Sequence, residues 1–298
     1  MSRTARLGKV LTAMVTPFTP EGEVDLDGVV TLARYLVDHG NDGLVLSGTT
    51  GEAPTLTDDE KLELFTAVRD AVDVPLWAGV GSNDTRHTCG LAARAADTGV
   101  DALLVVTPYY NRPSQAGLEA HFGAVAAASD LPVVMYDIPG RTGRKISTEV
   151  LIRLANEVDT IVGIKDASGN PGETGKVIAS APDDFAVWSG DDPMTLPLLA
   201  VGAVGVVGTA THWCGEHMSE LVAAFEKGDH ARAREINASL FPSYEYESRE
   251  TAQFALAVKV AIRNLGLPAG PCRLPIGPEP DALDGEARAV LEGLGLLP

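Results

Sequence analysis

The sequence predicts an α/β fold, a (β/α)8 TIM barrel followed by a small C-terminal helical region. Three observations indicate this. Short apolar runs rich in β-branched residues recur eight times, and nearly every run is followed by an amphipathic segment. The runs are continuously apolar, as expected of parallel strands buried on both faces. Eight such units in about 225 residues also match the usual length of a closed barrel.

The elements can be assigned in order along the chain. Residues 27–39 carry apolar side chains at helical spacing, and Thr57-Asp58-Asp59-Glu60 has the capping-box pattern that begins a helix. Ser82-Asn83-Asp84, Ser114 and Ser147 are predicted to cap three further helices. The predicted strands are residues 10–15, 43–46, 75–80, 102–106, 132–136, 160–164, 185–188 and 205–207.

An open, doubly wound sheet is the alternative fold. Its dinucleotide fingerprint needs a third glycine, which the best candidate segment, Gly79–Asp84, lacks, and no GxxxxGK[ST] motif occurs. From about residue 213 the strand signals stop, and helices are predicted over residues 213–227, 229–240, 248–265 and 284–294. The first of these closes the barrel. We therefore expect a catalytic barrel of residues 1–227 and a helical region of residues 228–298 that packs against it.

Composition and charge exclude several classes of function. The 298 residues are 45% hydrophobic and carry a formal net charge of −18, which argues against nucleic acid and anionic membranes as partners. The three cysteines contain no CxxC pair, so neither a disulfide framework nor a structural zinc site is expected. No segment is long and apolar enough for a membrane span or a signal sequence. We therefore expect a cytoplasmic protein.

One lysine stands apart from the others. In a (β/α)8 barrel, residues at the C-terminal ends of strands face the active site. Of the seven lysines, only Lys165 ends an apolar strand at that side. Desolvation in an apolar barrel disfavours the charged amine, lowers its pKa and makes it a nucleophile toward ketones. The alternative is a salt bridge, for example with Asp166, and position alone does not decide between the two.

Other strand ends carry groups suited to a small carboxylate. Strand two ends in Ser47–Glu52 (Ser-Gly-Thr-Thr-Gly-Glu), whose hydroxyls and backbone amides could bind a carboxylate. Strand four ends in Thr107–Tyr110, and strand five in Tyr136–Gly143. The tyrosines there could relay protons, and Arg141 offers a guanidinium fork suited to a substrate carboxylate. Four strands that bring such groups to one face favour catalysis by Lys165.

Two further clusters have plainer explanations. His212 and His217 are spaced to share a helix face, but a third ligand is not evident, so packing is preferred to a metal site. Asp191 and Asp192 could be an acid and base pair of a glycosidase, yet adjacent residues point in different directions. Capping of the helix that begins at Pro193 is preferred for this pair.

The chain resembles the dihydrodipicolinate synthase (4-hydroxy-tetrahydrodipicolinate synthase) family of the N-acetylneuraminate lyase superfamily over nearly its whole length. The double threonine and the arginine after Pro-Gly are the features more specific to the synthase branch. The motifs that carry the resemblance are Gly48–Glu52, Thr107–Pro113, Tyr136–Gly143, Gly163–Ala167 and Ser189–Asp192.

The resemblance implies a class I, Schiff-base lyase that condenses pyruvate with L-aspartate-4-semialdehyde in lysine and diaminopimelate biosynthesis, without a metal or organic cofactor. Lys165 would form the imine with pyruvate. Tyr136 would exchange protons near it, in a relay completed by Thr49 and by Tyr110 from a neighbouring subunit of a homotetramer built as a dimer of dimers. The implied substrate-binding residues are Thr50 for the pyruvate carboxylate, Val207 through its backbone, and Arg141 for the semialdehyde carboxylate.

The chain departs from the family pattern in two places. Members that L-lysine inhibits at a site near Asn83 and Tyr109 tend to carry a serine, a histidine and an acid where this chain has Ala53, Lys61 and His87. A cation at Lys61 would repel the inhibitor's ammonium, so weak feedback is expected. An Asn-Pro pair that often precedes the late helix is replaced by residues 251–255 (Thr-Ala-Gln-Phe-Ala), which bears on C-terminal packing and on the tetramer.

Three other functions are alternatives. A pyruvate-dependent lyase or aldolase acting on a sugar acid or keto acid would need hydroxyl-binding groups rather than the carboxylate clamp that Arg141 offers. A catalytically inactive barrel that serves as a binding module is disfavoured by the intact set of Lys165, Tyr136, Tyr110 and Thr49. A metal-dependent aldolase would lose its activity to a chelator.

Overall fold

The computed structural model describes residues 4–252 and 254–298. Eight parallel strands form a closed barrel in chain order, which confirms the predicted fold class, and no predicted strand end is displaced by more than two residues. The described residues include no helix long and apolar enough to cross a membrane. The strands are β1 (Val10–Ala13), β2 (Gly43–Leu46), β3 (Leu76–Gly79), β4 (Ala102–Val106), β5 (Val133–Asp137), β6 (Ile161–Asp166), β7 (Ala186–Ser189) and β8 (Gly205–Gly208).

The chain divides into two compact units. The first comprises Met1–Lys9 and Pro75–Val207, and the second Val10–Val74 and Gly208–Pro298. The residues after Lys227 share the second unit with Val10–Val74, so this division does not coincide with the boundary expected between residues 227 and 228. That boundary stays a prediction.

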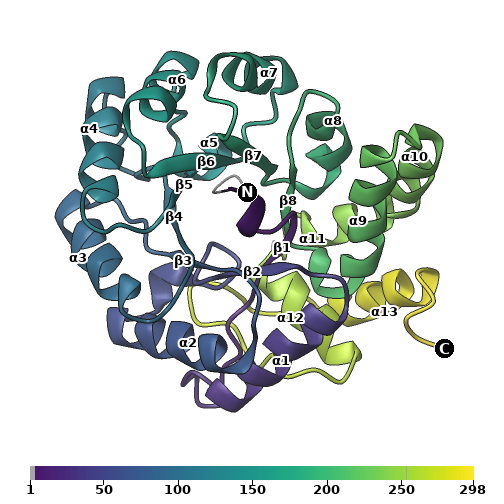
Figure 1. Cartoon of the computed structure of the whole chain (residues 1–298). Helices are drawn as coiled ribbons and strands as arrows, with labels where there is room; N and C mark the ends of the chain where they lie inside the picture. Colours follow the sequence, from purple (N-terminus) through teal and green to yellow (C-terminus); the bar gives the residue numbers. More distant parts are fainter. Residues whose placement is uncertain (1–3, 253) are drawn as a thin grey trace. The chain divides into compact units, whose positions relative to one another are not determined.

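In the first unit, each strand from β3 to β7 pairs in parallel with the next one. The longer helices lie on the outer side of these strands, as Figure 1 shows for α4, α6 and α7. The short helices α5, η3 and α8 follow the C-terminal ends of β5 and β7, whereas η1 precedes β1. The elements are η1 (Thr4–Arg6), α3 (Thr85–Ala96), α4 (Gln115–Ala126), α5 (Pro139–Thr142), α6 (Thr148–Glu157), α7 (Pro171–Ser180), η3 (Asp192–Met194) and α8 (Thr195–Leu199).

Two tryptophans fasten the N-terminal segment to this unit. The rings of Trp77 and Trp188 meet edge to face, with centroids 4.8 Å apart, and both side chains are fully buried. Their indole N–H groups donate to the carbonyls of Leu7 and Gly8, at 3.2 and 2.9 Å. Gly163 lies against Trp188, since a Cβ there would come within 2.7 Å of the Trp188 ring. The interior of these strands is therefore densely packed.

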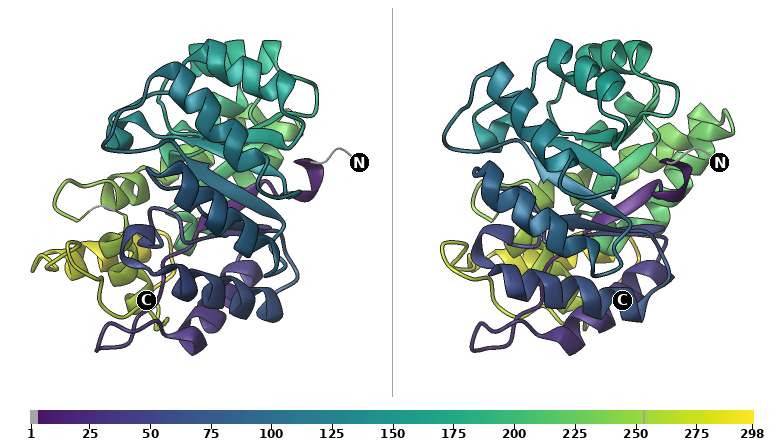
Figure 2. Two further views of the ribbon diagram at one scale, coloured as in Figure 1. Left: turned by 90° about the vertical axis from the view of Figure 1, so that its left-hand side faces the viewer. Right: turned by 60° about the vertical axis from the view of Figure 1, so that its left-hand side comes forward.

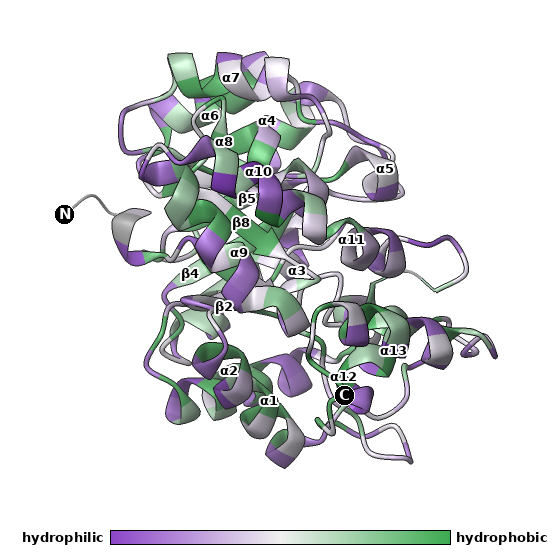
Figure 3. Ribbon diagram, turned by 90° about the vertical axis from the view of Figure 1, so that its right-hand side faces the viewer, coloured by the Kyte–Doolittle hydropathy of each residue, from purple (hydrophilic) through white to green (hydrophobic). Residues whose placement is uncertain are grey.

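In the second unit β1 pairs in parallel with β2, and α1 packs against α2. Figure 2 also shows α12 beside α13 near the C-terminus. In Figure 3, α1 and α2 carry apolar residues on one side and polar residues on the other, as expected of helices that cover a core. The elements are α1 (Leu26–Asp38), η2 (Ala53–Thr55), α2 (Asp58–Ala71), α9 (Thr211–Glu226), α10 (His230–Ser239), α11 (Phe241–Glu247), α12 (Ala255–Asn264) and α13 (Leu283–Gly293).

The predicted helix caps are confirmed. Thr57 and Glu60 form a reciprocal capping box at the start of α2. The side chains of Asp84, Ser114 and Ser147 accept hydrogen bonds from the first turns of α3, α4 and α6. These contacts are local in sequence, which is why the residue pattern revealed them.

The single helix predicted over residues 248–265 is wrong. α11 ends at Glu247, and α12 begins only at Ala255. Phe254 interrupts the run, because its φ of 49° is incompatible with a right-handed helix. The helix therefore begins at Ala255, seven residues later than predicted. Within the unusual segment 251–255, Gln253 lies outside the described residues.

Candidate active site

Lys165 and Tyr136 are neighbours in the first unit. They are register partners on the parallel strands β5 and β6, and the Lys165 Nζ atom lies 4.4 Å from the Tyr136 ring centroid. Both side chains are buried, at 5% and 4% exposure. Thr107 fixes the Tyr136 backbone, because its N–H and its hydroxyl both donate to the Tyr136 carbonyl, at 2.9 and 3.0 Å. A phenol is thus held beside a buried amine.

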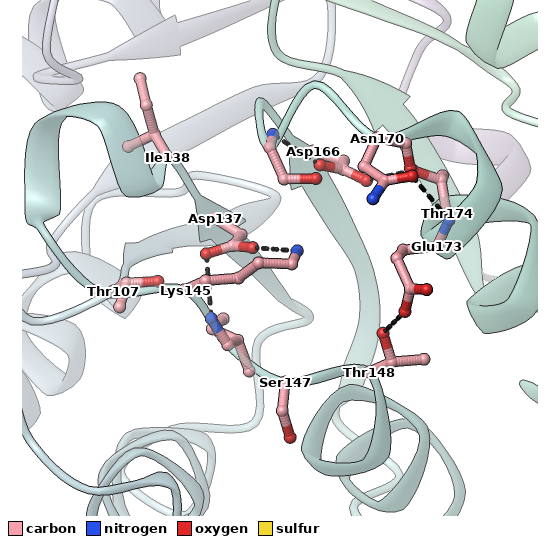
Figure 4. A network of polar contacts seen from close by, with 12 residues as sticks. Thr107, Asp137, Ile138, Lys145, Ser147, Thr148, Asp166, Asn170, Glu173 and Thr174 are labelled. Atoms are coloured by element: carbon pink, nitrogen blue, oxygen red, sulfur yellow. Dashed lines mark hydrogen bonds and ion pairs between the residues drawn. The ribbon is translucent and has the colours of Figure 1, made fainter.

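The next residue on each of the two strands is a buried carboxylate. Asp137 and Asp166 are again register partners, and Figure 4 shows each carboxylate facing its own set of donors. Asp137 accepts from Lys145 Nζ at 3.0 Å and from the Ile146 N–H at 3.1 Å. Burial raises the pKa of Asp137, and the Lys145 ammonium opposes that shift.

Asp166 has partners other than the lysine that precedes it. Its carboxylate accepts from the Ser168 N–H at 2.8 Å and from the Thr174 hydroxyl at 2.6 Å (Figure 4). Successive residues of a strand point to opposite faces, so Lys165 and Asp166 diverge. The salt bridge with Asp166, considered above as the alternative role for Lys165, therefore finds no support.

A glycine lies directly against the lysine stem. A Cβ on Gly190 would come within 2.9 Å of Lys165 Cγ and 3.0 Å of its Cε. Gly190 also donates its N–H to the Asp166 carbonyl at 2.8 Å, which joins the loop after β7 to the end of β6. Only a residue without a side chain leaves the Lys165 stem in this position. Sequence reasoning missed this role, although Gly190 lies within a motif that it quoted.

The expected capping role is wrong for Asp191 and stays a prediction for Asp192. Asp191 stands at the N-cap position of η3, but its side chain makes no capping hydrogen bond. Partial desolvation and the neighbouring Asp192 raise the pKa of Asp191, while Lys165 opposes them. Asp191 is thus an exposed acid within the electrostatic field of Lys165. No sequence signal distinguished this from capping, because both roles place an acid before a helix.

Arg141 and Tyr110 also belong to the first unit. Arg141 lies in the short helix α5 after Tyr136, and desolvation lowers its pKa while Tyr136 opposes the change. Tyr110 is 90% exposed and has a φ of 73°, an unusual conformation for a tyrosine. Val207 is buried in β8, at 1% exposure. Tyr136 therefore lies beside the Lys165 amine and within the electrostatic field of Arg141, whereas Tyr110 projects into solvent.

Thr49 and Thr50 belong to the second unit, in the loop that follows β2. Thr50 is buried and Thr49 half-buried. The Glu52 N–H donates to the Thr49 carbonyl at 3.1 Å, and the Thr16 hydroxyl donates to the Gly51 carbonyl at 2.7 Å. The loop is thus tightly folded, and a Cβ on Gly51 would come within 2.9 Å of the Met14 carbonyl.

His212, considered above as a metal ligand, is bonded to backbone on both sides of its ring. Nδ1 lies 2.7 Å from the Thr209 carbonyl, and Nε2 accepts the Val15 N–H at 3.1 Å. Burial lowers its pKa to about 4. Among residues 4–252 and 254–298, no three histidine, cysteine or acidic side chains are grouped so that they could hold a metal ion. The histidine therefore joins two segments of the second unit.

A family model described as the dihydrodipicolinate synthetase family matches residues 6–293. The chain belongs to this family. It is 54% identical to the 4-hydroxy-tetrahydrodipicolinate synthase of Acidothermus cellulolyticus, over 92% of this chain and 88% of that protein. It is 47% identical to the synthase of Moorella thermoacetica, over 97% and 99% of the two chains. The predicted family is therefore confirmed.

A solved family structure, DHDPS from Cyanidioschyzon merolae with lysine bound, has a TM-score of 0.95 and 39% identity, over 98% of this chain and 99% of that one. Their places at strand ends drew attention to Lys165 on β6 and Tyr136 on β5, and the family resemblance implied their roles. Gly190 and Asp191 became apparent only from their spatial relation to Lys165. The roles of all the predicted site residues stay predictions.

Proposed function

We propose that this chain has 4-hydroxy-tetrahydrodipicolinate synthase activity, in which pyruvate condenses with L-aspartate-4-semialdehyde on Lys165 in the lysine and diaminopimelate pathway. The observation that carries the proposal is the buried Lys165 amine beside the Tyr136 phenol, 4.4 Å from its ring centroid. The family membership and the high identity to synthases support the same activity.

In the proposed reaction the neutral Lys165 Nζ adds to C2 of pyruvate, and water leaves to form an imine. Loss of a C3 proton gives an enamine, whose C3 attacks the aldehyde carbon of the semialdehyde. The amine of the semialdehyde then attacks C2, closes the ring and releases Lys165. Tyr136 is proposed to donate and accept the protons at the imine, in a relay with Thr49 and Tyr110.

Two groups are proposed to bind the substrate carboxylates. Thr50 would hold the pyruvate carboxylate through its hydroxyl and backbone amide, and Val207 would contact pyruvate through its backbone. Arg141 would bind the semialdehyde carboxylate, for which a guanidinium is the suited partner because it can form two parallel hydrogen bonds. A superfamily lyase for sugar acids would instead need hydroxyl-binding groups, so the guanidinium of Arg141 on α5, just after the strand that carries Tyr136, favours the synthase.

The chemistry is tested by trapping. Incubation with pyruvate and borohydride should add a reduced pyruvate adduct to Lys165, located by peptide mass spectrometry. Lys165→Met should abolish the adduct, whereas Lys176→Met, which removes an exposed lysine of α7, should not. Absence of the adduct in the unaltered protein would overturn the mechanism. An adduct without turnover of the semialdehyde would instead favour the sugar-acid or keto-acid lyase.

We further propose a homotetramer, a dimer of dimers, in the cytoplasm. The 90% exposure of Tyr110 supports an assembly in which this ring is covered by a partner. The three free cysteines agree with a reducing compartment. Sedimentation velocity at several protein concentrations should give the mass of four chains, and Tyr110→Ala should weaken the assembly. A monomer at all concentrations would contradict the proposal.

A further inference from the structure

A buried ion pair joins the C-terminal region to the loop that carries the two threonines. Lys259, on α12, places its Nζ atom 2.6 Å from Glu52 Oε1, and the two side chains are 1% and 0% exposed. The two residues are 207 positions apart in the chain. The Lys259 ammonium also donates to the Pro271 carbonyl at 2.7 Å and lies 4.1 Å from the Phe18 ring centroid. Burial lowers the pKa of Lys259, and the Glu52 carboxylate opposes this shift and favours the charged amine.

Glu52 is the last residue of the Gly48–Glu52 motif. Its φ of 58° is sparsely populated by residues other than glycine, so the conformation must be held by its surroundings. The loop closes around it, because the Glu52 N–H donates to the Thr49 carbonyl and the Ala53 N–H donates to the Gly48 carbonyl at 3.2 Å. Fixing the Glu52 side chain therefore fixes the backbone on either side of Thr50.

The second carboxylate oxygen of Glu52 is also bonded. Oε2 accepts the Arg273 N–H at 2.8 Å. The Arg273 side chain then donates to the carbonyls of Gly22 and Thr55, each at 2.8 Å, and pairs with Glu60 at the start of α2. The position of Glu52 is thus set by two segments of the C-terminal region, one through a side chain and one through a backbone amide.

Removal of the lysine alone would leave a buried carboxylate without its counter-ion. Such an unpaired charge is unfavourable, and the structure around it must shift to reach water or another donor. Glu52 is two residues from Thr50, which is proposed to bind the negative carboxylate of pyruvate. Both the displacement and the uncompensated negative charge would weaken binding of an anion in this loop.

We infer that Lys259 is a positioning residue for pyruvate. Lys259 acts through Glu52 on the Gly48–Glu52 loop and does not touch the substrate. The inference rests on the proposed function, because it needs the loop to bind the pyruvate carboxylate. It assigns α12, a helix of the C-terminal region, a part in substrate affinity beyond its packing.

The test compares Lys259→Met with Arg263→Met in the full chain. Both lie on α12, but Arg263 loses only an exposed ion pair with Glu279. The readouts are KM for each substrate, kcat, and the pyruvate concentration that gives half-maximal borohydride trapping at Lys165. We expect K259M to raise this concentration and KM for pyruvate roughly tenfold or more, the effect of one lost hydrogen bond to a charged group. KM for the semialdehyde should stay unchanged, and R263M should match the unaltered protein.

Circular dichroism establishes whether K259M is folded. If it is not, the double variant E52Q/K259M decides, since it leaves no unpaired charge while still lacking the ion pair. The result that would overturn the inference is half-maximal trapping in the deciding variant at the same pyruvate concentration as in the unaltered protein, with a difference only in the amount of adduct. That result would show a purely structural role for Lys259. If the unaltered protein itself forms no adduct, the proposed function has failed. An adduct in that protein together with unchanged affinity in the variant defeats only the inference about Lys259.

Discussion

The Lys165 Nζ atom lies 4.4 Å from the Tyr136 ring centroid, and the two residues are register partners on adjacent parallel strands. Strand pairing therefore sets their separation, rather than any flexible loop. A cation over an aromatic face is attracted to the ring, so the same contact can steady the amine when it is protonated. The proposed imine chemistry thus rests on rigid elements of the first unit, and the first prediction concerns the phenol.

Replacing Tyr136 by phenylalanine keeps the ring against Lys165 but removes the hydroxyl that would move protons. We expect kcat to fall about 10²- to 10⁴-fold, the usual contribution of a general acid or base. Trapping of pyruvate on Lys165 should still be detectable after long incubation. Steady-state kinetics with both substrates measure the effect, and an unchanged kcat would remove Tyr136 from the mechanism.

Arg141→Met should affect the second substrate only. Loss of the guanidinium removes the proposed carboxylate partner, so KM for the semialdehyde should rise roughly 10- to 100-fold, as expected for hydrogen bonds to a charged group. The concentration of pyruvate for half-maximal trapping should not change. Arg153→Met, which breaks an exposed pair with Glu119, is the control. Equal effects on both substrates would argue against the assigned role.

Gly190→Ala should impair the lysine without unfolding the chain. The added methyl would lie 2.9 Å from Lys165 Cγ, so the stem must move away from its position beside Tyr136. A misplaced nucleophile should lower the rate of imine formation about tenfold or more. Gly123→Ala is the control, because a Cβ there meets nothing within 4 Å. The prediction fails if both variants trap pyruvate at the unaltered rate.

The ion pair between Glu60 and Arg273 should make stability depend on acidity. Hydrogen bonding to Arg273 lowers the pKa of Glu60 from 4.5 to about 2. A depressed carboxyl pKa stabilises the folded state fully above pH 4.5, and this stabilisation is lost as the pH falls toward 2. Glu60→Gln should therefore cost about 1 kcal/mol of unfolding free energy at pH 7, since solvent screens a partly exposed pair.

Urea unfolding at pH 7, 5 and 3.5 tests this dependence. The difference between the unaltered protein and E60Q should be constant from pH 7 to 5 and smaller at pH 3.5. A difference that grows with acidity would contradict the assignment.

L-Lysine should inhibit the chain weakly or not at all. Lys61 stands where inhibitable members of the family tend to carry a histidine, and its ammonium would repel that of the effector. Lys61 is 8% exposed, and its Nζ atom lies 3.9 Å from Asp58 Oδ1. Initial rates with and without L-lysine are the measurement. Strong inhibition would show that Ala53, Lys61 and His87 do not abolish the effector site.

The sequence by itself determined the barrel, the helix caps and Lys165 at the end of its strand. Each depends on local physics: continuous apolar runs for buried parallel strands, a side chain bonding its own first turn for a cap, and chain order for the strand end. The incorrect prediction of one helix over residues 248–265 shows the limit of that reasoning. The neighbouring sequence gives no sign that Phe254 has a positive φ.

Only the tertiary structure decided what surrounds the lysine and the loop. The role of Gly190 is apparent only from the Lys165 side chain that packs against it. The role of Asp191 is apparent only from the electrostatic field of Lys165, which lies on β6. Lys259 and Glu52 are 207 positions apart in the sequence. The energetic importance of their ion pair comes from its burial, which the residue pattern does not reveal. Helical periodicity and helix capping depend on residues close together in the sequence. The environment of a buried charge forms only when segments distant in the sequence pack together and exclude water.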